Sequence, residues 1–247
     1  MIRTLGLRKA FGPKTVLAGV DLAVGQGESL CVIGQSGTGK SILLKCILGL
    51  VAPDGGQVFW HDRPLDAATR PDFFRRFGML FQGGALFDSL TVWQNVGFRL
   101  RQRMPDARAR AIALDKLARV GLGPETADLM PAELSGGMAK RVGLARAIAD
   151  DPEVIFFDEP TTGLDPIRAR RINDLIRGIV TETGATAITI THDMDSVRAI
   201  GDRVALLQDG HIAWDGPVAG MDRAAPLAGF LGRSQVPPAR HSPGTAT

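Results

Sequence analysis

The feature that most constrains the fold is the stretch Gly34–Ser41, which matches the phosphate-binding pattern G-x-x-x-x-G-K-[ST]. Its glycines let backbone N–H groups point at phosphate oxygens without a Cβ in the way. Lys40 adds a positive charge for the β- and γ-phosphates, and Ser41 offers a hydroxyl to Mg²⁺. An apolar, β-prone run precedes the loop and a helical pattern follows it. The stretch therefore predicts a strand, a nucleotide-binding loop and a helix, in that order.

Composition bounds the rest of the molecule. The 247 residues suffice for one large domain or a core with a small subdomain, and 45% hydrophobic residues support a real core. A net charge of +3 is too small to argue for a nucleic-acid partner. Cys31 and Cys46 have no metal-binding spacing, so we expect buried, reduced thiols of a cytosolic protein. We expect no secretory signal, and the longest apolar run, 42–52, is too short for a bilayer. If this protein serves a membrane, another chain must supply the spans.

The first third of the chain is rich in β-like runs. Residues 2–33 predict a small antiparallel sheet leading into the phosphate loop, and 57–60 predict a further short strand. Phe11 is a candidate platform for adenine, because a flat ring can stack on a base, although a core position is equally compatible with the pattern. Residues 76–82 predict a buried strand that ends in Gln82.

The segment 88–149 predicts helices. Thr91 and Gln94 fit a capping box, Asp106 is an N-cap candidate, and Gly121 fits a helix end. Five arginines crowd this segment and indicate either a solvated face or contact with anionic lipid headgroups: Arg99, Arg101, Arg103, Arg108 and Arg110.

A second anion-binding element follows at Ser135, Gly136 and Gly137. Ser135 is a natural helix cap, and the two glycines allow an anion to approach the helix start closely. This element meets either the nucleotide of the same chain or that of a second copy.

Acidic side chains follow a strongly apolar run at 154–157. Four apolar residues in a row indicate a strand buried on both faces, as in a parallel sheet. Asp158 can hold Mg²⁺ beside Ser41, and Glu159 is a candidate general base for water, the alternative being a plain acidic turn. His192 directly follows the β-prone run 185–191 and can reach the γ-phosphate, although a lone histidine is usually structural.

Several local signals complete the organisation. Asp165 and Pro166 predict a helix start, with Asp165 as N-cap, and Gly184 predicts its end. Residues 204–214 predict a hairpin built on an Asp-Gly turn. The segment 233–247, with its prolines and small polar residues, predicts a disordered tail.

These pieces, in this order, resemble the ATP-binding cassette (ABC) ATPases over nearly the whole chain, from Ile2 to about Pro217. The resemblance implies an α/β P-loop NTPase fold with a mixed or parallel core sheet, an N-terminal antiparallel β subdomain and an inserted helical subdomain. It divides a single domain, 1–232, into a core of 1–87 and 150–232 and a helical part of 88–149.

The family also implies roles for individual residues. Glu159 polarises the attacking water, His192 contacts the γ-phosphate, and Gln82 and Lys40 complete the catalytic set. Mg²⁺ is held by Ser41, Gln82 and Asp158, and Asp165 lies at a dimer interface. Ser135, Gly136 and Gly137 bind the ATP of the opposite subunit. The chain's own ATP is bound by Phe11, Gly34, Gln35, Ser36, Gly37, Thr38, Gly39, Lys40, Ser41 and Ile42. The sequence departs from the family at Phe11, often a tyrosine, and at Met138, often a glutamine.

The implied function is ATP hydrolysis by a dimer that drives a transmembrane permease from the cytoplasmic face of the inner membrane. The loop 82–90 would grip the permease through Leu86 and Phe87. The stretches 80–92 and 134–141 resemble the ATPase of Mla/MCE-type phospholipid transporters, which implies an MCE-type lipid-binding protein and a small regulatory subunit as further partners.

Other classes of protein share such a cassette. DNA-repair relatives insert long coiled coils between Lys40 and Asp158, and translation-factor relatives carry two cassettes, whereas this sequence does neither. A pure nucleotide-binding scaffold would lack a base such as Glu159. An importer of amino acids or ions stays open, because other subunits choose the cargo.

Overall fold

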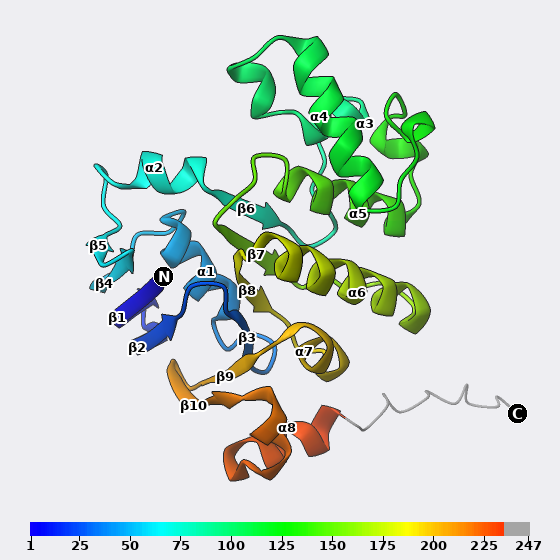
Figure 1. Cartoon of the computed structure of the whole chain (residues 1–247). Coiled ribbons are helices and arrows are strands. Elements are labelled where there is room, and N and C mark those ends of the chain that lie inside the picture. The colour runs from blue at the N-terminus through cyan, green and yellow to red at the C-terminus, as the bar shows by residue number, and fades with distance from the viewer. Residues whose placement is uncertain (235–247) are drawn as a thin grey trace, which may run out of the picture.

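The computed structural model describes residues 1–234, whose strands form two sheets (Figure 1). The larger sheet has the order β10-β9-β3-β8-β7-β6. Its strands are β3 (Ser29–Ile33), β6 (Phe77–Leu80), β7 (Val154–Asp158), β8 (Thr186–Ile190), β9 (Arg203–Gln208) and β10 (His211–Pro217). All neighbours are parallel except β9 and β10, so the predicted parallel core sheet is confirmed.

Each face of the larger sheet packs against a different layer. Successive side chains of a strand point to opposite faces, and Cys31 and Ile33 accordingly pack with the apolar residues of helices α5, α6 and α7. Leu30 and Val32 instead pack with helix α1 and the smaller sheet. Burial on both faces is the reason why these strands are almost wholly apolar.

The smaller sheet is antiparallel, as expected, with the order β2-β1-β4-β5. It consists of β1 (Ile2–Phe11), β2 (Lys14–Val24), β4 (Gly55–Trp60) and β5 (Arg63–Pro64). β1 and β2 are longer than the short runs expected. β3, which the sequence interpretation grouped with them, joins the larger sheet because its side chains are buried on both faces.

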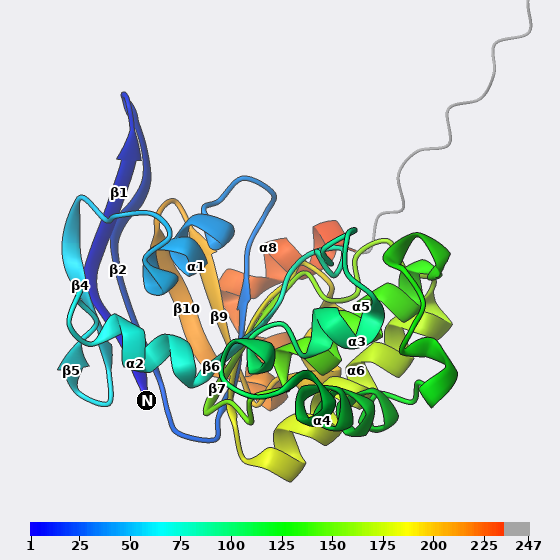
Figure 2. The same ribbon diagram turned by 90° about the horizontal axis from the view of Figure 1, so that it is seen from above.

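The helices are α1 (Lys40–Leu48), α2 (Arg70–Arg75), α3 (Val92–Val96), α4 (Asp106–Arg119), α5 (Gly136–Ala147), α6 (Pro166–Thr183), α7 (Met194–Ile200) and α8 (Ala225–Ser234). The predicted helical segment comprises α3, α4 and α5, which gather at the end of the molecule away from the smaller sheet (Figure 2). Of these, α5 packs directly on β6 and joins this group to the larger sheet.

Most of the capping predictions hold. The Asp165 carboxylate accepts from the N–H groups of Ile167 and Arg168 at 3.1 and 3.0 Å, and Gly184 ends α6 at φ 64°. Asp106 was expected to cap α4, but this is wrong: Pro105 occupies the cap position.

Asp106 is instead the first helical residue, and its carboxylate pairs with Arg101 at 3.0 Å. Other arginines of the crowded segment also have partners within the chain. Arg99 pairs with Asp150 at 3.2 Å and donates to the Phe77 carbonyl at 2.9 Å.

The remaining expectations concern the cysteines, the tail and the membrane. Cys31 and Cys46 are buried and free, and burial raises the pKa of Cys31 to about 12. The predicted tail 233–247 lies outside the described residues, apart from Arg233 and Ser234, which belong to α8. Within residues 1–234, every helix is too short or too polar to cross a membrane.

Candidate functional site

The phosphate loop joins β3 to the N-terminus of α1, as predicted. Gly37 has φ 80° and Gly39 has φ 102°, which is the left-handed region that favours glycine. A Cβ at Gly34 would lie 2.5 Å from the Leu207 carbonyl oxygen, and one at Gly39 would lie 2.7 Å from Val16. The pattern of glycines is therefore required by backbone conformation and by the close approach of β2 and β9.

The Lys40 side chain folds back over this loop. Its Nζ donates to the carbonyls of Gly34 and Gln35 at 2.7 and 3.0 Å, and the residue is 8% exposed. Burial lowers the pKa of Lys40, while the nearby Glu159 and Asp158 oppose that shift. Backbone carbonyls thus hold the ammonium group at the loop.

Phe11 lies beside the loop and not in the core. It is 49% exposed and lines a cleft of about 340 Å³ together with Lys14, Val16, Gly37, Gly39, Lys40, Ser41 and Ile42. The Lys9 ammonium, which sequence reasoning did not single out, lies 5.3 Å from the centre of the Phe11 ring. An aromatic ring beside a phosphate loop is an arrangement that fits a nucleotide base and its phosphates.

Asp158 ends β7 with one oxygen that lacks a partner. Its Oδ1 is buried and makes no hydrogen bond within the described part of the chain. Burial, and secondarily the charge of Glu159, raises the pKa of this carboxyl group. A bound cation would compensate both effects, so the residue fits the Mg²⁺ site that the sequence predicts.

The described residues contain no cluster of three or more His, Cys, Asp or Glu side chains that could hold a metal. Ser41 and Gln82 would therefore have to contribute a hydroxyl and an amide, together with phosphate oxygens of a nucleotide. Gln82 lies exposed after β6, and none of the described hydrogen bonds involves its side chain. Among the described residues, no hydrogen bond joins Gln82 to Asp158.

Glu159 and His192 are in direct contact. His192 Nδ1 lies 2.9 Å from Glu159 Oε1, and the hydroxyl of Thr162 donates to Glu159 Oε2 at 3.0 Å. Glu159 has φ 49°, a left-handed conformation that costs a non-glycine residue about 1–3 kcal/mol. The fold therefore orients this carboxylate from two sides at the edge where β7 and β8 end. Sequence reasoning missed Thr162, because nothing but its nearness to Glu159 in the chain singles it out.

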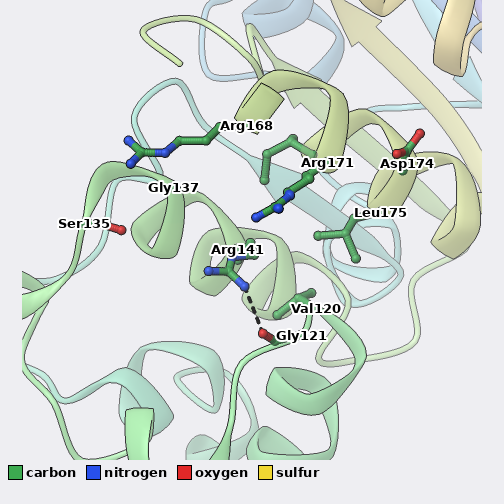
Figure 3. Close-up of a pocket in the computed structure, with 10 residues that line it drawn as sticks. Val120, Gly121, Ser135, Gly137, Arg141, Arg168, Arg171, Asp174 and Leu175 are labelled. Atoms are coloured by element: carbon green, nitrogen blue, oxygen red, sulfur yellow. Dashed lines mark hydrogen bonds between the residues drawn. The ribbon is translucent and has the colours of Figure 1, made fainter. Parts of the chain in front are cut away.

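The second anion-binding element lies at a different cleft of the same chain. Ser135 caps α5, and its Oγ accepts from the Met138 N–H at 3.3 Å. Ser135 and Gly137 line a cavity of about 460 Å³ beside α5 and α6, and three arginines also line it (Figure 3). These arginines, which sequence reasoning did not predict, are Arg141, Arg168 and Arg171.

The two clefts have no lining residue in common among those described. Asp165, at the start of α6, pairs with Arg168 at 3.2 Å and so lies close to the arginine-lined cavity. The structure therefore brings Phe11, Lys40 and Ser41 together, and Glu159 with His192, but it leaves Ser135, Gly136 and Gly137 at a separate surface.

Comparison with known proteins identifies relatives of the whole arrangement. A family profile described as "ABC transporter" matches residues 17–162. The Probable ribonucleotide transport ATP-binding protein mkl of Mycobacterium bovis is 38% identical, over 87% of this chain and 61% of the relative. The methionine import ATP-binding protein MetN of Mesorhizobium japonicum is 41% identical, over 88% of this chain and 60% of the relative. Protein TRIGALACTOSYLDIACYLGLYCEROL 3, chloroplastic, of Arabidopsis thaliana is 40% identical, over 87% and 68%.

The chain thus spans about three fifths of the length of the first of these relatives. Among solved structures, a dimeric ATP-binding cassette in a post-hydrolysis state with ADP and Pi superimposes with a TM-score of 0.80 and 31% identity, covering 88% of this chain and 99% of that one. The cassette cbiO1 of Clostridium perfringens, part of the ABC transporter complex cbiONQ, superimposes with a TM-score of 0.79 and 27% identity. The match covers 94% of this chain and 98% of that one.

Proposed function

The chain belongs to the ABC transporter ATP-binding family, and we propose that two copies of it hydrolyse ATP at shared sites to drive a membrane permease. The observation that carries this proposal is the separation of the two anion-binding elements within one chain. A second copy, related by a two-fold axis, would bring the Ser135–Gly137 stretch of one chain to the phosphate loop of the other. The dimeric state of a solved relative with ADP and Pi supports this arrangement.

The residues of the site have distinct parts in the proposed reaction. The Lys40 ammonium would exchange its hydrogen bonds to the carbonyls of Gly34 and Gln35 for contacts with the γ-phosphate. Glu159, held by Thr162 and His192, would accept a proton from the attacking water.

Ser41, Asp158 and Gln82 would hold Mg²⁺, which would neutralise phosphate charge. Hydrogen bonds to charged groups contribute about 1.5–3 kcal/mol each, so loss of the γ-phosphate would open the dimer.

A groove beside β6 is the proposed contact for the permease. Its aromatic rim is exposed at Phe81, Phe87 and Phe98, and the groove encloses about 460 Å³. Aromatic side chains are enriched at the centres of protein interfaces. Leu86 was expected to point outward with Phe87, but the structure corrects this, because Leu86 is partly buried against the core.

For the cargo we propose a lipid moved at the inner membrane, with an MCE-type lipid-binding protein and a small regulatory subunit as partners. The resemblance of stretches 80–92 and 134–141 to Mla/MCE-type ATPases supports this, as does the galactolipid in the name of the Arabidopsis relative. Import of an amino acid is the second candidate, favoured by the 41% identity to a methionine import protein.

Mixing two inactive variants tests the two-copy site. Ser135→Arg blocks the surface offered to the partner's nucleotide, and Glu159→Gln removes the base, so each homodimer should be inactive. In a mixed dimer one site keeps both Glu159 and Ser135, and roughly a quarter of wild-type hydrolysis should return if chains pair at random. Mixing should precede addition of ATP, so that homodimers are not already closed.

Two outcomes contradict the proposal. If Ser135→Arg alone hydrolyses ATP at the wild-type rate, the site is complete within one chain. If mixing restores nothing while both variants still bind ATP, the second copy does not supply Ser135. For the cargo, mass spectrometry of chains and lipids that co-purify from detergent-solubilised membranes should find lipid with an MCE-type protein; an amino-acid-binding protein would favour the importer.

A further inference from the structure

We propose that Lys140 is a positioning residue that holds the loop carrying Glu159 against helix α5. This inference rests on the ATPase function proposed above and adds a residue that acts through the base. Lys140 lies one and a half turns after Ser135 on α5, and neither the motifs nor the site description assigns it a role.

The contacts of Lys140 are with the chain immediately after Glu159. Its Nζ donates to the carbonyl oxygens of Pro160 and Thr162, both at 2.7 Å. Thr162 in turn donates from its hydroxyl to Glu159 Oε2 at 3.0 Å. One ammonium group therefore fixes the backbone on which the base and its hydrogen-bond donor both sit.

The Lys140 side chain is buried where it makes these contacts. Lys140 is 5% exposed, and no carboxylate within residues 1–234 forms an ion pair with it. Burial lowers the pKa of Lys140, and the charge of Glu159 opposes the shift, so the two groups lie within electrostatic reach. An ammonium group buried on carbonyls alone is costly, and a core position needing only volume would be filled by an apolar side chain.

The conformation of Glu159 explains why the loop needs an external anchor. With φ 49°, the residue occupies a region that a non-glycine backbone leaves readily unless its surroundings hold it. The hydrogen bonds from Lys140 supply such a restraint just beyond Glu159. Without them, Pro160–Thr162 could relax and the carboxylate would leave the geometry needed to receive a proton.

The same helix also holds the loop that follows β6. Less than two turns after Lys140, Arg146 donates to the carbonyls of Gly84 and Ala85, both at 2.8 Å. Helix α5 thus carries Ser135 at its start, the anchor of Glu159 in its middle and the anchor of the 82–90 loop near its end. A rigid helix keeps these three contacts at fixed spacing.

The experiment compares Lys140→Met, Lys140→Gln and the control Lys116→Met. Methionine keeps an unbranched apolar stem but donates nothing, so kcat should fall about 10- to 100-fold while the Kd for ATP stays unchanged. Glutamine keeps two N–H donors on a stem one bond shorter, so it should restore part of kcat. Lys116 is equally buried, 6% exposed, and pairs with Asp151 far from the site; its loss should lower the Tm but not kcat.

A double variant separates positioning from general damage to the fold. If Lys140 acts through Glu159, then Lys140→Met should slow hydrolysis no further in a Glu159→Gln background. A wild-type kcat for Lys140→Met, or additive losses in the double variant, overturns the inference. If Lys140→Met does not fold, Lys140→Gln is combined with Glu159→Gln instead. Additive losses of hydrolysis in that double variant would again overturn the inference. A wild-type protein that hydrolyses no ATP would instead overturn the proposed function itself, and this inference with it.

Discussion

The phosphate-facing edge of the larger sheet and the aromatic groove beside β6 are built by different means. At the edge, strand ends and a glycine loop place Lys40 and Asp158 through contacts between neighbours in the chain. In the groove, Phe81 and Phe87 come from the segment between β6 and α3, and Phe98 follows α3.

A single buried side chain orders that segment. Asn95, 0% exposed, accepts from the Phe87 N–H at 2.7 Å and donates to the carbonyls of Phe87 and Leu90 at 3.1 and 2.9 Å. The difference teaches that chemistry at the edge is encoded locally, whereas the surface for a partner depends on tertiary packing.

The largest expected effect lies at the edge. Glu159→Gln should slow ATP hydrolysis by about 10²–10⁴-fold, because the amide cannot take the proton that a general base accepts. ATP should still bind, and the ATP-bound dimer should persist in size-exclusion chromatography. Glu153→Gln, at the opposite end of β7 and paired with His61 at 3.0 Å, is the matched control with unchanged turnover. Near-normal phosphate release by Glu159→Gln would remove Glu159 from this role.

A second effect concerns the ring beside the loop. Stacking of a base on an aromatic side chain contributes about 1–3 kcal/mol, so Phe11→Ala should weaken ATP binding by about 5- to 150-fold. Phe11→Tyr keeps the ring and should bind like the wild type. Isothermal titration calorimetry measures both, and an unchanged Kd for Phe11→Ala would show that the base lies elsewhere.

A smaller effect, on stability, tests the electrostatics of the edge. The pKa of Asp158 is raised in the folded state, so folding favours its protonated form, and stability is lost as the pH rises through that raised pKa. At neutral pH the ionised carboxylate therefore destabilises the protein in the absence of metal. Asp158→Asn should raise the Tm by about 2–4 °C. Thermal scans of both proteins without Mg²⁺ check this, and a Tm that falls contradicts the account.

The smallest effect on the isolated protein is expected in the groove. Phe87→Asp should change the ATPase rate less than about twofold, because the ring is 44% exposed and lines the groove beside β6, not the cleft at the phosphate loop. It should nevertheless abolish co-purification with membrane chains. Leu5→Asp, on β1 and 41% exposed, controls for a new surface charge. Retained co-purification of Phe87→Asp would place the permease contact on another surface.

These contrasts show how much the sequence could predict. Gly34–Ser41, the acids at the end of β7 and the cap Asp165 follow from patterns only a few residues long, and the structure places each in the expected element. Thr162, Lys140 and Asn95 could not be predicted, because what distinguishes them is a contact created by the fold. The prediction that Leu86 points outward was wrong for the same reason, because the direction of a loop side chain depends on packing that no short sequence pattern records.

The left-handed backbone of Glu159 has a consequence for descendants of this gene. Glycine would relieve the strain there, and asparagine would reduce it, while either would remove the carboxylate. A duplicated copy freed from selection for turnover should therefore drift toward these two residues and gain stability as it does. Glycine or asparagine directly after the terminal aspartate of β7 would then mark a lineage that still binds nucleotide but no longer hydrolyses it.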